Sequence, residues 1–131
     1  MAKKNNKKDQ KNKKILLIED DPFIEDIYRT EFESQGIEID VVKDGEECLK
    51  KIKKERFDVL LLDLLLPKVS GWEILEEINS NPSLKNIKVV VLSNLDQQTD
   101  IDKATKLGAV KYLIKSNYTP AEIAEEVKEI L

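Results

Sequence analysis

Hydrophobic residues follow two alternating spacings from Lys14 to the C-terminus. Short apolar runs are separated by longer segments whose apolar residues recur every three or four positions. The first spacing is typical of buried strands and the second of amphipathic helices. Five strands are predicted, at residues 15–18, 37–42, 58–63, 88–92 and 110–114.

A helix is predicted after each strand, and turn residues indicate where several of them begin or end. The first spans residues 22–35 and ends at Gly36, and the second begins after Asp44. The third contains Ile74, Leu75 and Ile78 and ends before Asn81-Pro82. The fourth lies within 99–107, and the fifth reaches Leu131 from a Thr-Pro-Ala-Glu capping box at 119–122.

Five strand-helix units in succession favour an α/β fold with a parallel sheet. Right-handed crossovers place helices on both faces of such a sheet. The chain has 131 residues, which is enough for one hydrophobic core. In parallel sheets of this kind ligands bind at the carboxyl ends of the strands, so functional residues are expected there.

Composition narrows the classes of function. The longest apolar run, at residues 59–66, is interrupted by Asp63 and is far shorter than the roughly 20 residues that cross a bilayer. No signal peptide is predicted, and the one cysteine, Cys48, indicates a reducing cytoplasm. The chain contains no histidine, which excludes His-based nucleophile triads and any phosphohistidine of its own.

Basic residues are concentrated at the N-terminus. Residues 1–14 contain seven Lys and one Asp, which leaves 15 Lys and Arg against 25 Asp and Glu in the rest of the chain. We predict a disordered Lys-rich tail at residues 1–13, with contact to nucleic acid or an acidic membrane as the alternative. The acidic remainder repels polyanions, so no direct DNA binding is expected.

Acidic residues follow two of the predicted strands. Glu19, Asp20 and Asp21 come directly after the first strand, and Asp63 is the last residue of the third. Carboxylates that converge repel one another unless a cation lies between them, and Mg²⁺ suits a site with few carboxylates. The alternative is that the acidic triplet caps the positive end of the next helix.

Three residues at strand ends together match the needs of a phosphoryl group. Asp63 interrupts an apolar run, Ser93 closes the fourth strand, and Lys115 closes the fifth. Taken singly, each has a plain structural explanation: Asp63 as a helix-capping or hydrogen-bonded aspartate at a strand end, Ser93 as a turn former, and Lys115 as a solvated surface lysine. Combined with a metal they supply the cation and the hydroxyl that phosphoryl oxygens require.

These segments strongly resemble the response regulator receiver family, to which the chemotaxis response regulator also belongs. The resemblance rests on residues 15–21, 59–67 with Gly71, 89–93 and 112–115, in the order and at the separations usual for the family. It implies a receiver domain at 14–131 with a flavodoxin-like, doubly wound, three-layer α/β/α fold and strand order 2-1-3-4-5. It further implies a signalling switch of a two-component phosphorelay rather than an enzyme.

The resemblance also implies the roles of individual residues. Asp63 is expected to accept phosphate from the phosphohistidine of a kinase or phosphotransfer protein. Asp20, Asp63 and the backbone carbonyl of Leu65 are expected to bind Mg²⁺, with Glu19 assisting through water.

Lys115 and Ser93 are expected to hold the phosphoryl oxygens, and Tyr112 to be the aromatic residue of the switch. The alternative for Tyr112 is a partly buried aromatic residue on an edge strand.

Departures from the family pattern lead to further expectations. Ser116 replaces the usual proline, so a cis peptide is not expected there and the loop is expected to be looser. Asn94 stands where a small residue is common and is expected to crowd the path between Ser93 and Tyr112. Leu65 and Leu95 are apolar at positions that influence hydrolysis, so a long-lived phosphoaspartate is predicted.

Other classes of function fit less well. A phosphorylation-independent interaction module does not explain the complete set of site residues. A phosphatase that forms an aspartyl phosphate requires a second aspartate where Leu65 stands, and a flavin carrier requires a first loop rich in Gly, Ser or Thr.

Output is expected through the fourth helix, fifth strand and fifth helix, which bind an unknown partner or, after phosphorylation, a second copy.

Overall fold

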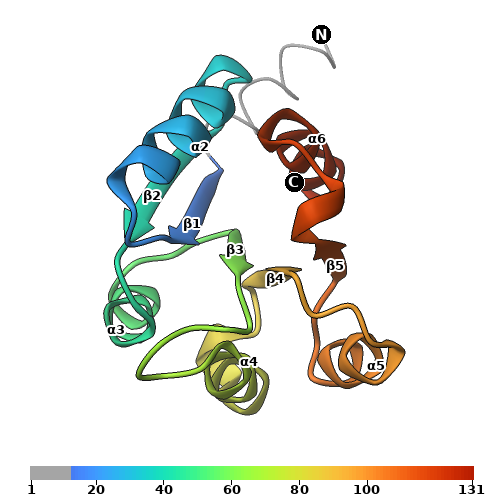
Figure 1. Cartoon of the computed structure of the whole chain (residues 1–131). Helices are drawn as coiled ribbons and strands as arrows, with labels where there is room; N and C mark the ends of the chain where they lie inside the picture. Colours follow the sequence, from blue (N-terminus) through green and yellow to red (C-terminus); the bar gives the residue numbers. More distant parts are fainter. Residues whose placement is uncertain (1–12) are drawn as a thin grey trace, which may run out of the picture.

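The computed structural model describes residues 13–131, which form a five-stranded sheet in the order β2-β1-β3-β4-β5. All four strand pairings are parallel (Figure 1). The predicted α/β class and strand order are therefore confirmed. The predicted tail at 1–13 lies, apart from Lys13, outside the described residues. The strands are β1 (Lys14–Ile18), β2 (Glu38–Val42), β3 (Val59–Leu62), β4 (Lys88–Ser93) and β5 (Lys111–Ile114).

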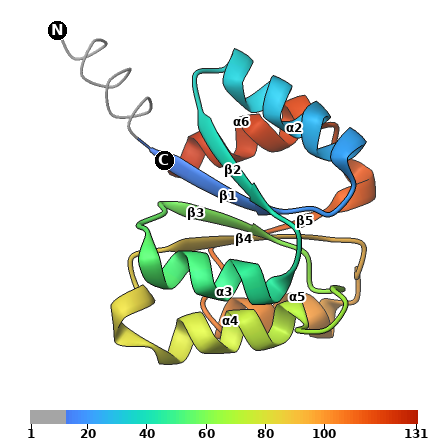
Figure 2. The same ribbon diagram turned by 90° about the vertical axis from the view of Figure 1, so that its left-hand side faces the viewer.

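Helices cover both faces of the sheet, as a doubly wound fold requires. Figure 2 shows α2 and α6 on one face and α3, α4 and α5 on the other. The elements are α2 (Pro22–Ser34), α3 (Gly45–Lys54), α4 (Gly71–Ser80), α5 (Gln98–Lys106) and α6 (Pro120–Ile130), with two short 3₁₀ turns, η1 (Pro82–Leu84) and η2 (Lys115–Asn117).

Local signals explain where two of these helices begin. The Asp44 carboxylate accepts a hydrogen bond from the Glu47 amide at 2.9 Å, which satisfies a free donor in the first turn of α3. At the start of α6 the Thr119 side chain accepts a hydrogen bond from the Glu122 amide, and the Glu122 side chain accepts one from the Thr119 amide. This is the predicted capping box.

The sheet divides the core into two layers because successive side chains of a strand point to opposite faces. Leu17, Leu61 and Leu113 pack with α2 and α6. Leu62 and Val91, on alternate positions, pack with α3, α4 and α5. A side chain at a strand end therefore belongs to one layer or the other, and this decides which site residues meet.

One predicted strand end needs correction. Asp63 follows β3 instead of ending it, because the ladder with β4 stops at Leu62 and the Asp63 side chain bonds the chain two residues on. The predicted range 110–114 ends at Ile114, as β5 does, and Lys115 begins η2, where its carbonyl accepts a bond from the Tyr118 amide. Ser93 ends β4, as predicted.

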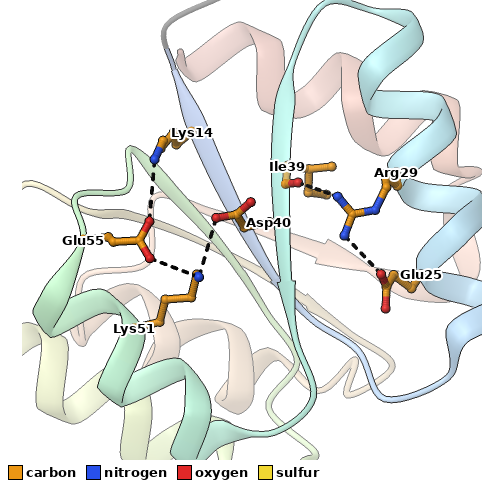
Figure 3. Close-up of polar contacts among 7 residues, drawn as sticks. All are labelled: Lys14, Glu25, Arg29, Ile39, Asp40, Lys51 and Glu55. Carbon is orange, nitrogen blue, oxygen red and sulfur yellow. Dashed lines mark hydrogen bonds and ion pairs between the residues drawn. The ribbon is translucent and has the colours of Figure 1, made fainter.

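Ion pairs link the edge of the sheet to its helices away from the carboxyl ends of the strands (Figure 3). Lys51 on α3 contacts Glu55 at 3.0 Å and Asp40 of β2 at 3.8 Å. Arg29 on α2 donates to the Ile39 carbonyl at 3.0 Å and pairs with Glu25. Partly exposed ion pairs contribute little to stability, so these contacts add little to the packing of the two core layers.

No helix within residues 13–131 is long and apolar enough to cross a membrane.

Candidate functional site

Asp63 lies at the carboxyl end of the central strand with its two carboxylate oxygens in different environments. Oδ1 accepts a hydrogen bond from the Leu65 amide at 2.9 Å. Oδ2 faces the Lys115 ammonium at 3.6 Å, an ion pair too long to be a hydrogen bond. Both side chains are partly exposed. One oxygen is thus fixed by the backbone, and the other faces a cation.

Glu19 lies beside Asp63 because β1 and β3 are neighbours in the sheet. Leu17 pairs with Leu61, and the same register two residues further on brings Glu19 opposite Asp63. Glu19, Asp63 and Lys115 line one small cavity of about 10 Å³. A cavity of that size is near the minimum for one water molecule. Three predicted site residues are therefore brought together.

Tyr28 of α2, which has the helical spacing of a core residue, lines the same cavity. Only 6% of Tyr28 is exposed, so nearly all of its side chain is buried. Burial raises the pKa of Tyr28 above its usual value, and the charges of Glu19 and Asp63 raise it further. The phenol therefore remains a neutral donor beside two carboxylates. The only signal in the sequence was a hydroxyl at a core position of the helix.

Ser93 and Tyr112 lie on the other face of the sheet. Ser93 has the same side-chain direction as Val91, and Tyr112 packs against that layer of the core. Ser93 is fully buried, and its hydroxyl accepts a bond from the Leu95 amide at 3.3 Å. The Tyr112 hydroxyl donates to the Leu95 carbonyl at 2.7 Å. Both side chains thus hold the loop that follows β4.

Tyr112 also lies within the electrostatic influence of Asp63. Burial raises its pKa first, and the charges of Asp100, Asp63 and Asp96 add to this in that order. The ring is only partly buried, and its hydroxyl is bonded to the loop. Tyr112 is therefore a partly buried aromatic residue on an edge strand, and this position is also compatible with the predicted role in the switch.

The three acidic residues after β1 make different contacts. Asp21 is the N-cap of α2 and accepts bonds from the Phe23 and Ile24 amides at 2.9 and 3.4 Å. Glu19 accepts a bond from the Asp21 amide at 3.1 Å and turns towards the cavity. Asp20 is exposed and makes no side-chain bond within the described part of the chain. The capping alternative therefore holds for Asp21 alone.

The chemistry of these donors fits a hard divalent cation. Glu19, Asp20 and Asp63 provide carboxylate oxygens, and Leu65 provides a carbonyl close to Asp63, whereas Lys115 is the cation paired with Asp63. Among residues 13–131 there is no cluster of three or more His, Cys, Asp or Glu side chains that could hold a metal. The predicted site has only two carboxylates that bind the metal directly, Asp20 and Asp63, so a search for three or more side chains does not test it. These metal ligands stay a prediction.

Comparisons with known proteins point to one family. A profile described as "Response regulator receiver domain" matches residues 15–128. The Bacillus subtilis alkaline phosphatase synthesis transcriptional regulatory protein PhoP is 32% identical over 120 residues, which are 92% of this chain and 49% of PhoP. The chain spans about half the length of most curated relatives that it matches.

Solved structures share the fold of this chain. The receiver domain of the Francisella response regulator 1452 superposes with a TM-score of 0.81 at 29% identity, covering 91% of this chain and 96% of that domain. The Mn²⁺-bound form of response regulator Rcp1 superposes with a TM-score of 0.74 at 31% identity, covering 90% and 91%.

Proposed function

The chain belongs to the response regulator receiver domain family of two-component systems, and we propose that Asp63 is the residue through which it accepts a phosphoryl group. The observation that carries this proposal is the position of Asp63 after the central strand, with its Oδ2 atom 3.6 Å from the Lys115 ammonium. Receiver domains act as signalling switches, so the consequence of phosphorylation is a change in what the domain binds.

The unequal environments of its oxygens favour Oδ2 of Asp63 as the nucleophile. The Leu65 amide holds Oδ1, whereas Oδ2 has no hydrogen-bond donor within residues 13–131. In the transfer, Oδ2 forms a bond to phosphorus as the bond between phosphorus and the donor's imidazole nitrogen breaks. The electron pair of that bond leaves with the imidazole.

Lys115 and Ser93 supply the groups that hold the transferred phosphoryl oxygens. Lys115 is already paired with Asp63 and offers a charge-assisted contact. The Ser93 hydroxyl, now bonded to the Leu95 amide, is the donor on the other side. Engagement of Ser93 by a phosphoryl oxygen alters the loop after β4, to which the Tyr112 hydroxyl is also bonded. Tyr112 is in this way the residue that reports phosphorylation to the surface.

Receiver domains generally bind Mg²⁺, and this chain has donors that suit the ion. Asp20, Asp63 and the Leu65 carbonyl would hold it directly, and Glu19 would act through water. When bound, Mg²⁺ supplies positive charge that neutralises the phosphoryl oxygens. Exposed Asp20, free of any cap, is the carboxylate available for this purpose.

The donor of the phosphoryl group is a sensor histidine kinase or a phosphotransfer protein, because this chain has no histidine. Output would use the surface of α5, β5 and α6, with a partner or a second copy bound there after phosphorylation. The absence of direct DNA binding, the role of the Lys-rich tail and the cytoplasmic location stay predictions. The alternative function is an interaction module that keeps the fold and works without phosphate.

The proposal is tested by intact-mass spectrometry after incubation with acetyl phosphate and Mg²⁺. A single phosphate adduct is expected, and Asp63→Asn should abolish it. Asp21→Asn is the matched control, because asparagine still caps α2 and the variant removes a carboxylate near the site. An unlabelled wild type would favour the phosphate-independent module, and undiminished label in Asp63→Asn would mean that another residue is the acceptor.

A further inference from the structure

Two residues that depart from the family pattern contact each other. The Ser116 amide donates a hydrogen bond to Asn94 Oδ1 at 2.9 Å, across 22 residues of sequence. Asn94 directly follows β4, and Ser116 is the middle residue of η2. The bond therefore joins two loops at the carboxyl edge of the sheet. We call it the Asn94–Ser116 latch.

The latch meets a need of the backbone at the start of η2. The first amides of any helical turn lack partners within the turn and require an acceptor from elsewhere. Ile114 is the N-cap of η2 and has no side chain that can accept a bond. Asn94 supplies that acceptor from another loop. A proline at position 116 has no amide hydrogen and could not make this contact.

The latch lies next to both groups that contact the phosphoryl oxygens in the proposed function. Ser93 precedes Asn94, and Lys115 precedes Ser116. The loop after β4 has a second tie to β5, because the Tyr112 hydroxyl donates to the Leu95 carbonyl. The loop that follows Ser93 is thus tied to the lysine-bearing turn at Asn94 and to β5 at Leu95.

We propose that the Asn94–Ser116 latch is a positioning contact that holds Lys115 in register with Ser93 for phosphoryl binding, in place of the rigidity of a proline at 116. This role rests on the proposed function, whereas the bond itself does not. Asn94 acts through the backbone of Ser116 and touches neither Asp63 nor the phosphoryl group. Its loss loosens η2 and lets Lys115 leave its place beside Asp63.

The bond is tested first by amide hydrogen exchange of the full chain without phosphodonor. In Asn94→Ala the Ser116 amide should exchange about threefold to tenfold faster, the effect of one exposed hydrogen bond. Asn94→Asp keeps an acceptor oxygen and should keep the slow exchange. Gln97→Ala is the matched control, because the Gln97 side chain is also an amide after β4 and, within residues 13–131, bonds only the neighbouring Asp96 side chain. Equal exchange in the wild type and Asn94→Ala would overturn the latch.

The positioning role is tested by initial rates of phosphorylation with acetyl phosphate and saturating Mg²⁺. Asn94→Ala should be about threefold to tenfold slower than the wild type, and Gln97→Ala unchanged. Ser116→Pro removes the donor, so Asn94→Ala should have no further effect in that background. The same reduction in both backgrounds, or no reduction in either, would overturn the role.

The two proposals fail in different ways. A wild type that takes no label overturns the proposed function and the positioning role with it, whatever the exchange rates show. A wild type that is labelled normally, and an Asn94→Ala variant labelled just as fast, overturns only the positioning role. If Ser116→Pro does not fold, the comparison of Asn94→Ala with Gln97→Ala alone decides the role.

Discussion

Alanine at Gly71 is expected to destabilise the domain and to displace Asp63. Gly71 begins α4 directly against the end of β3. A Cβ atom there would overlap the Asp63 carbonyl oxygen and lie 2.5 Å from the Leu64 Cα. Both atoms belong to backbone that cannot rotate away. Gly71 does not have a positive φ, so close approach is the reason for glycine at this position.

The size of the effect follows from two opposing terms. Alanine in a helix gains up to about 1 kcal/mol over glycine. Overpacking costs about 1 to 3 kcal/mol, and a clash with backbone belongs at the upper end of that range. The expected net loss is about 2 kcal/mol, or a fall in Tm of about 6 to 12 °C for a domain of this size.

The loss is measured by urea denaturation, as a lower midpoint with an unchanged slope. Gly36→Ala is the control, because no atom lies within 4 Å of a Cβ at Gly36 and only its φ of 79° is unfavourable for alanine. Both variants should lose stability, but only Gly71→Ala should also be phosphorylated more slowly. A Gly71→Ala protein as stable as the wild type would refute the steric argument.

Four further predictions follow from single residues. Burial raises the pKa of the Cys48 thiol to about 12, so a thiol reagent at pH 8 should label Cys48 only as fast as the protein opens; immediate labelling would contradict this. Folding raises the pKa of Tyr28 above its value of about 10 in the unfolded chain, so the stability that the neutral phenol contributes is complete below pH 10 and is lost as the pH rises through the folded pKa. In urea denaturation between pH 9 and 11, the free energy of unfolding of Tyr28→Phe should therefore fall less than that of the wild type. Thr119→Ala should lower the free energy of unfolding by about 1 kcal/mol, and Thr119→Ser should restore most of it. The phosphorylated wild type should lose its label slowly in Mg²⁺ buffer, and Leu65→Asn should shorten that lifetime; rapid loss from the wild type would contradict the shielding by apolar side chains.

The fold and the strand-end residues could be predicted because they depend on local spacing. Ser93 and Lys115 each follow a run of β-branched and apolar residues, and parallel strands bring such positions to one edge. Asp63 was recognisable because a carboxylate within an apolar run requires a special reason. The error of one residue at Asp63 comes from a side-chain bond to the chain beyond the end of the strand.

Contacts between distant loops could not be predicted in this way. Tyr28 has the helical spacing of a core residue, and that spacing does not show that its side chain lines the cavity beside Asp63. Asn94 and Ser116 were recognised separately as unusual and were expected to crowd and loosen the loops. Their mutual bond depends on the paths of two loops, which periodicity does not describe. The peptide bonds within residues 13–131 are all trans, as expected without the proline.

The most direct test of the account is to locate the phosphoryl group on the chain. Borohydride reduces an aspartyl phosphate to homoserine, and tryptic residues 57–68 form one peptide that contains both Asp58 and Asp63. After labelling with acetyl phosphate and reduction, fragment spectra should show homoserine at position 63 and intact Asp58. Homoserine at position 58, or a modification within residues 19–21 instead, would contradict the assignment of Asp63 as the acceptor.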